Sequence, residues 1–154
     1  MSAERFTLDT NILVYSVDRS SPVKHGAARR IIDLAVHRDC WLTLQAISEF
    51  YAAAVRKSRM PAADAAAQAS DWLDLFPSLP ASSTAIRTAL SAAASARLSY
   101  WDALLVASAA EGGCVAILTE DMADGAVLDG VRVINPFGRD GLSDAASRLL
   151  RPDE

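Results

Sequence analysis

The chain has 154 residues, of which 51% are hydrophobic and 22% charged, a composition typical of one globular domain and unlike that of a disordered chain. No apolar run approaches the roughly 20 residues that a membrane-spanning helix needs, and the N-terminus lacks the pattern of an export signal, so we expect a cytoplasmic protein without a membrane partner. The formal net charge of −4 supplies no overall positive field, and any nucleic-acid partner must be held by a local site.

The first half of the chain alternates strand-like and helix-like segments. Residues 5–8 predict a first strand that ends at Asp9, and residues 40–44 predict a second, buried strand. The spacing of apolar residues, together with the helix start Ser20-Ser21-Pro22, predicts a short turn or helix over 11–17 and helices over 23–37 and 45–56. In the helix predicted over 45–56, the residues that we expect to face the core are Ile47, Phe50, Tyr51, Ala54 and Val55.

The second half continues the alternation. Helices are predicted over 61–76, from Ser82 or Ser83 to about Arg97, and from a Ser99 cap to Glu111. Strands are predicted over 115–119 and 131–134, whereas Leu79-Pro80 permits at most an edge strand, and 142–150 predicts a peripheral helix. Strands that alternate with helices indicate an α/β fold with a mostly parallel sheet and helices on both faces.

Acidic side chains follow the predicted strands. Asp9, Glu49 and Asp121 come after three separate strand-like runs, and Asp102 lies in the first turn of a helix. Because loops after parallel strands open on the same edge of a sheet, we expect these four carboxylates to converge. Converging carboxylates repel one another unless a cation neutralises them, and oxygen ligands suit Mg²⁺ or Mn²⁺. The sequence therefore predicts a divalent-metal site at this edge.

Each of these acids also has a simpler interpretation. Asp9 can cap the turn that follows it, Asp102 can pair with Ser99 at a helix start, and Asp121 and Glu49 can be solvated surface residues. Those interpretations do not explain why acids follow three separate strands at one edge of the sheet. Asp124 is a further candidate ligand, and the residues expected to hydrogen-bond the carboxylates or metal-bound water are Thr10, Asn11 and Thr119.

Four sequence blocks carry a resemblance to a known family. They are Leu8-Asp9-Thr10-Asn11, Ser48-Glu49-Phe50, Tyr100-Trp101-Asp102-Ala103 and Leu118-Thr119-Glu120-Asp121-Met122, the last followed by Asp124-Gly125. In this order and at these separations they resemble the acidic blocks of PIN-domain nucleases, and more narrowly those of VapC-type toxins of bacterial toxin–antitoxin pairs. The resemblance covers about Phe6 to Phe137, so we expect a single PIN-like domain over 1–137 and a tail over 138–154 without an assigned role.

The resemblance implies both a fold and an activity. The fold is a three-layer α/β/α sandwich, and the activity is that of a Mg²⁺- or Mn²⁺-dependent endoribonuclease, often dimeric and silenced by a cognate antitoxin protein. By position, Asp9 and Asp102 become the main metal ligands, with Glu49 and Asp121 completing the acidic set. A PIN-like module that binds RNA or protein without cutting, and a housekeeping RNA-processing nuclease, remain the alternatives.

An acidic site needs basic residues at its rim to hold an RNA backbone. The candidates in this sequence are Lys24, Arg56, Lys57 and Arg59. Single-stranded loops are the expected targets, because their bases can splay out and stack on aromatic rings. Tyr100 and Trp101 are possible stacking platforms, although we expect both rings in the core.

Overall fold

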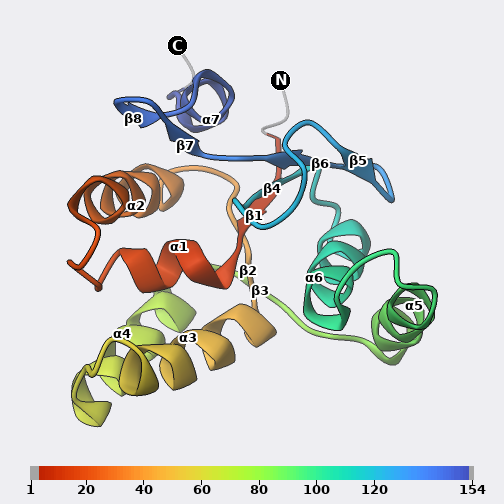
Figure 1. Cartoon of the computed structure of the whole chain (residues 1–154), viewed down its shortest axis with the longest axis horizontal. Coiled ribbons are helices and arrows are strands. Elements are labelled where there is room, and N and C mark those ends of the chain that lie inside the picture. The colour runs from red at the N-terminus through yellow and green to blue at the C-terminus, as the bar shows by residue number, and fades with distance from the viewer. Residues whose placement is uncertain (1–3, 153–154) are drawn as a thin grey trace.

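A four-stranded sheet organises the protein, which we describe from a computed structural model over residues 4–152 (Figure 1). Its strand order is β1-β4-β6-β5, with β1, β4 and β6 parallel and β5 antiparallel to β6. The strands are β1 (Phe6–Leu8), β4 (Ala116–Leu118), β5 (Val127–Leu128) and β6 (Val131–Ile134). The prediction of a mostly parallel sheet is confirmed, whereas β5, which is only two residues long, was not predicted.

Helices cover both faces of this sheet, as expected for an α/β fold (Figure 1). The helices are α1 (Thr10–Tyr15), α2 (Pro22–Ala35), α3 (Leu44–Arg56), α4 (Ala62–Leu75), α5 (Ser83–Ala94), α6 (Tyr100–Glu111) and α7 (Asp144–Leu150). One core packs Phe6, Leu8 and Leu118 of the sheet against α1, α2, α3, α4 and α7. A second core packs Ile117 and Val133, from the opposite face, against α6.

The predicted second strand does not join the central sheet as a full strand. Only Leu42–Thr43 forms β2, which pairs in parallel with β3 (Ser78–Leu79), while Cys40 makes a single bridge to Phe6 of β1. The helix starts at Leu44, one residue earlier than predicted, because the Thr43 hydroxyl accepts a hydrogen bond from the Ala46 amide at 3.0 Å and caps α3. The end of β2 nevertheless delivers α3 to the carboxyl end of β1.

The pattern of α3 is confirmed with one exception. Ile47, Phe50 and Ala54 are buried, and the Phe50 ring packs edge-on against Trp72 of α4 with ring centroids 4.6 Å apart. Tyr51 was expected to face the core and is 41% exposed. A tyrosine at the border of an apolar stripe can point its hydroxyl to water, so periodicity alone does not decide its side.

The segment after β6 builds more structure than a tail. A hairpin of β7 (Phe137–Gly138) and β8 (Gly141–Leu142) leads into α7, whose Leu150 is 1% exposed and lies in the same core cluster as β1. The helix over 142–150 was expected, but the hairpin was not. Across residues 4–152, no helix is long and apolar enough to cross a membrane.

Candidate active site

Asp9 occupies the junction of β1 and α1. Its amide donates to the Leu118 carbonyl at 3.0 Å, which extends the pairing of β1 with β4, and its side chain accepts a 2.6 Å hydrogen bond from the Thr119 hydroxyl. Only 9% of the residue is exposed. Burial raises the pKa of Asp9 to about 7; the Thr119 hydrogen bond opposes this rise and the nearby Asp121 carboxylate adds to it. Asp9 caps no amide of α1 with its side chain, so the capping interpretation fails.

Asp121 lies on the loop after β4, directly across from α1. Its carboxylate accepts a 2.6 Å hydrogen bond from the Asn11 side-chain amide, and its own backbone amide donates to the Thr119 hydroxyl at 3.1 Å. Thr119 therefore contacts both acids, donating to Asp9 and accepting from Asp121. The loop and α1 are fixed to each other by side chains that touch the carboxylates themselves.

Glu49 reaches the same place from α3. One of its oxygens accepts from the Thr10 hydroxyl at 3.2 Å and the other from the Gln45 amide at 2.7 Å. We had assigned Gln45 no function from the sequence, although its position four residues before Glu49 puts both on one face of the helix. The hydrogen bonds from Thr10 and Gln45 together fix the orientation of the Glu49 carboxylate in the cleft.

Asp102 enters from α6. The Ser99 hydroxyl accepts the Asp102 amide at 3.2 Å, so the predicted cap exists, although the Asp102 carboxylate makes no return bond to the Ser99 amide. Burial raises the pKa of Asp102; Ser99 opposes the rise, and the charges of Asp121 and Glu49 add to it. The carboxylate is therefore within electrostatic reach of acids from two other elements.

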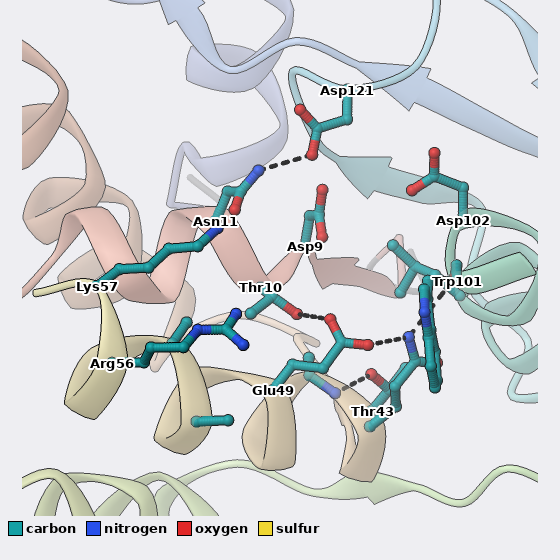
Figure 2. Close-up of a pocket in the computed structure, with 15 residues that line it drawn as sticks. Asp9, Thr10, Asn11, Thr43, Glu49, Arg56, Lys57, Trp101, Asp102 and Asp121 are labelled. Carbon is teal, nitrogen blue, oxygen red and sulfur yellow. Dashed lines mark hydrogen bonds between the residues drawn. The ribbon is translucent and has the colours of Figure 1, made fainter. Parts of the chain in front are cut away.

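All four carboxylates line one cleft of about 510 Å³ (Figure 2). Figure 2 shows Asp9 between Asp121, Asp102 and Glu49, with Arg56 and Lys57 to one side and Trp101 to the other. Trp101 was expected in the core and is 57% exposed. The first turn of α6 points it into the cleft, whereas the following residues from Ala103 to Ala109 are buried.

The donor chemistry of the cleft fits a hard divalent cation, since it offers carboxylate oxygens that repel one another. Among residues 4–152, no three His, Cys, Asp or Glu side chains stand close enough to form a ready-made metal cluster. The side chains that would hold an ion are those of Asp9 and Asp102, together with Asp121, whose charge acts on both of them. A bound cation would offset both causes of the raised pKa values of Asp9 and Asp102, since it stabilises a buried carboxylate in its charged form and neutralises the neighbouring charges.

Four predicted site residues lie outside the cleft lining, and of these only Thr119 contacts its carboxylates. The Asp124 carboxylate accepts the Asn135 amide at 2.9 Å and so ties its loop to the end of β6. Arg59 follows the end of α3 with a positive φ of 53°, which turns the chain away from the helix axis. Lys24 pairs with Glu120 at 2.8 Å. Sequence position placed these residues near the site but could not show which way each side chain points.

Lys24 belongs to a cluster behind the Asp121 loop, which we call the loop anchor: Lys24, Tyr15, Glu120 and Phe137. Glu120 accepts hydrogen bonds from both Lys24 and the Tyr15 hydroxyl, and the Lys24 ammonium lies 5.1 Å from the Tyr15 ring centre and 5.6 Å from that of Phe137. Although burial alone would raise it, these hydrogen bonds hold the pKa of Glu120 below its ordinary value. Glu120 thus faces away from the cleft while its neighbour Asp121 faces into it.

A family model described as PIN domain matches residues 6–123, which is more than half of the chain. The protein belongs to the PIN-domain family. The match includes all four carboxylates of the cleft and confirms the family expected from the sequence.

Solved structures share the fold at low identity. The Mycobacterium tuberculosis toxin VapC20, a Sarcin-Ricin loop cleaving toxin, has a TM-score of 0.62 at 15% identity, covering 75% of this chain and 89% of its own. A DNA-bound VapBC from Salmonella typhimurium has a TM-score of 0.61 at 17% identity, and the match covers 84% of this chain and 96% of that chain. A toxin–antitoxin complex from Klebsiella pneumoniae has a TM-score of 0.60 at 20% identity, and the match covers 88% of this chain and 98% of that chain. No curated protein matches the sequence significantly.

Proposed function

We propose that this PIN-domain protein is a Mg²⁺- or Mn²⁺-dependent endoribonuclease that hydrolyses RNA phosphodiester bonds. One observation supports this most strongly: four carboxylates from four different elements line a single open cleft, although burial and, to a smaller extent, their mutual repulsion raise the pKa values of Asp9 and Asp102. Such an arrangement is unfavourable in a purely structural role. It becomes favourable when a cation binds, which is the chemistry that PIN-domain nucleases use.

Each residue then has a part in the reaction. A bound divalent ion would attract the scissile phosphate and lower the pKa of a water molecule. Asp9 and Asp102 would hold the ion, with Thr119 and Asn11 fixing the directions of Asp9 and Asp121. Glu49 or Asp121, whichever is not fully used as a ligand, would accept the proton of the attacking water.

The decisive experiment is cleavage of a structured RNA by protein purified free of any partner. We expect cleavage with Mg²⁺ or Mn²⁺, none with EDTA, and a loss of at least 100-fold in Asp9→Asn. Asp71→Asn is the matched control, because it makes the same change on the exposed side of α4 and should cut as wild type. Absence of cleavage with either metal, or full activity of Asp9→Asn, contradicts the proposal.

We further infer that the protein is the toxin of a toxin–antitoxin pair and has a cognate antitoxin as its partner. Support comes from two of the structural neighbours, a VapBC complex and a toxin–antitoxin complex. In each, the match to this chain covers at least 96% of the matched chain. A small open reading frame directly upstream, encoding a DNA-binding fold with an amphipathic tail, is the expected genomic context. Its product should co-purify with the protein and suppress cleavage; a nuclease without such a neighbour is better assigned to RNA processing.

A further inference from the structure

The candidate cleft extends well beyond the carboxylates. One face of α3 forms its floor, on which Gln45, Glu49, Ala52 and Arg56 follow at helical spacing. At 1.5 Å of rise per residue, the eleven steps from Gln45 to Arg56 span about 16 Å. The acids occupy only the middle of this length, so the cleft has two further ends that metal binding does not explain.

The two ends differ in chemistry. At the Gln45 end stands Trp101, an exposed indole whose backbone carbonyl lies 3.5 Å from the Gln45 side-chain amide. At the other end stand Arg56 and Lys57, both exposed, and neither has a carboxylate within 4 Å among residues 4–152. Cations without partners beside an acidic cluster are available for an anion from outside.

The floor between the ends is formed by small side chains. Ala52 and Ala53 line the cleft between Glu49 and Arg56, so nothing larger than a methyl group obstructs a strand that runs along α3. An indole face, a set of carboxylates that would hold a cation, and a pair of free cations then follow in a line (Figure 2). This order matches a nucleic-acid strand, whose bases can stack on the indole and whose phosphates can meet the cations, better than an acidic peptide, which has no base to stack.

We propose that the cleft binds unpaired RNA in one register: a base stacks on Trp101, the adjacent phosphate lies at the carboxylates, and the phosphates that follow are held one by Arg56 and one by Lys57. The inference rests on the proposed ribonuclease function and adds to it the roles of the residues at the two ends of the cleft. A strand advances about 3.4 Å per stacked nucleotide and more when unstacked, so the cleft holds no more than about five nucleotides. A paired base cannot stack on Trp101 without leaving its duplex.

Binding is tested separately from cleavage, in an Asp9→Asn background, with fluorescein-labelled unpaired RNA hexamers and with a hairpin duplex of equal charge. Alanine at Trp101 should weaken hexamer binding about 5- to 150-fold, the range for loss of one base–aromatic stack, whereas Trp101→Phe should retain most of the affinity. The hexamer should quench the tryptophan emission of protein that keeps Trp101. It should not quench the emission of Trp101→Phe, because the indole on which the base stacks is absent there. The duplex should bind more weakly than the hexamer.

The cationic end is tested by salt dependence. Arg56→Gln and Lys57→Gln should each reduce the slope of log affinity against log salt by about 0.7, the single-strand value per phosphate contact. Arg30→Gln, the same change on the exposed side of α2, should leave the slope unaltered. Circular dichroism establishes that each variant is folded.

The outcomes separate this inference from the function on which it rests. If Trp101→Ala binds as well as Trp101→Phe, if the salt slope is unchanged in both cation variants, or if no hexamer binds, the register is wrong even when the wild type cuts RNA. If binding depends on Trp101 and the cations but wild type cuts nothing with either metal, the register stands and the nuclease function fails. Preference for the duplex also contradicts the inference.

Discussion

Asp9 is the most buried carboxylate of the cleft, and burial together with charge repulsion raises its pKa further than that of Asp102. Its pKa of about 7, against 3.8 for a free side chain, means that the folded protein holds a proton that the unfolded chain releases. Stability is therefore lost as pH rises from about 4 through about 7, the opposite direction from an aspartate in an ion pair.

The first prediction concerns this pH dependence in protein kept metal-free with EDTA. Asp9→Asn removes the ionising group, keeps an acceptor for Thr119 and offers Asp121 a donor. We expect it to melt several degrees above wild type at pH 8, by an amount that corresponds to a few kcal/mol at most, with the difference shrinking toward pH 5. Thermal unfolding followed by circular dichroism measures it, and an Asp9→Asn melting point below that of wild type at pH 8 refutes it.

The second prediction concerns the metal. Mn²⁺ or Mg²⁺ should raise the melting temperature of wild type at pH 8, because a ligand that binds only the folded state stabilises it, by about 2.7 kcal/mol at 100 times its Kd. The shift should be small in Asp9→Asn and unchanged in Asp71→Asn. At pH 5 it should weaken in wild type, since Asp9 then binds a proton. If the metal raises the melting temperatures of Asp9→Asn and Asp71→Asn equally, the ion binds elsewhere.

At the scale of elements, α1 is the short helix on which the site depends. It begins directly after Asp9, its Thr10 and Asn11 hydrogen-bond Glu49 and Asp121, and its Tyr15 holds Glu120 of the next loop. Two residues of α1 four positions apart thus hold two successive residues of the loop after β4. The loop anchor adds Lys24 of α2 from behind.

A third prediction follows from the loop anchor. Lys24→Met keeps most of the apolar stem but removes the charge from a pair that is partly exposed, so the free energy of unfolding should fall by less than about 1 kcal/mol. The larger effect should be local: backbone amides of 119–125 should exchange with deuterium several-fold faster. Arg30→Met on the same helix is the control. Unchanged exchange in Lys24→Met shows that the loop is held without the anchor.

At the scale of the whole molecule, the C-terminal segment completes the core that contains β1. Leu150 of α7 is 1% exposed and packs in the same cluster as Phe6 and Ile31, although the sequence resemblance ended the domain at Phe137. The fourth prediction is that Leu150→Ala lowers the free energy of unfolding by about 2–5 kcal/mol, the usual cost of truncating a buried leucine. Leu149→Ala, on a partly buried neighbour, should cost clearly less. Urea unfolding measures both, and equal costs contradict the packing role of α7.

A homodimer is the fifth prediction and remains a proposal. The middle helices expose Leu73 and Leu75 on α4 and Leu90 on α5, which are 44%, 57% and 54% accessible. The prediction rests mainly on the resemblance to VapC-type toxins, and these exposed leucines are apolar surface that a subunit interface would cover. Sedimentation should show a dimer at micromolar concentration, weakened by Leu90→Asp or by Leu73→Asp. A monomer at that concentration contradicts the prediction.

The carboxylate set could be found from the sequence because its geometry follows from local rules. Asp9 and Asp121 follow strands, Asp102 follows a Ser99 cap, and strands that are parallel end at one edge, so their acids converge without any knowledge of packing. Asp124 is an acid close to Asp121 in the sequence, and Arg59 is a cation close to Arg56, yet both lie outside the cleft. Their directions depend on a loop contact with Asn135 and on a positive φ, which no spacing encodes.

The sequence by itself determined the main helices, the three parallel strands of the central sheet and the acids, since helix and strand periods and strand-end positions are properties of the local chain. Only the tertiary structure decided that Trp101 faces the cleft, that Lys24 serves Glu120, and that α7 closes the core. Each of these depends on which distant segment lies opposite: α3 across from Trp101, the β4 loop across from Lys24, and β1 across from Leu150. Contacts between residues about 50 to 140 positions apart have no local signature, because the energy that selects them arises from packing the whole chain.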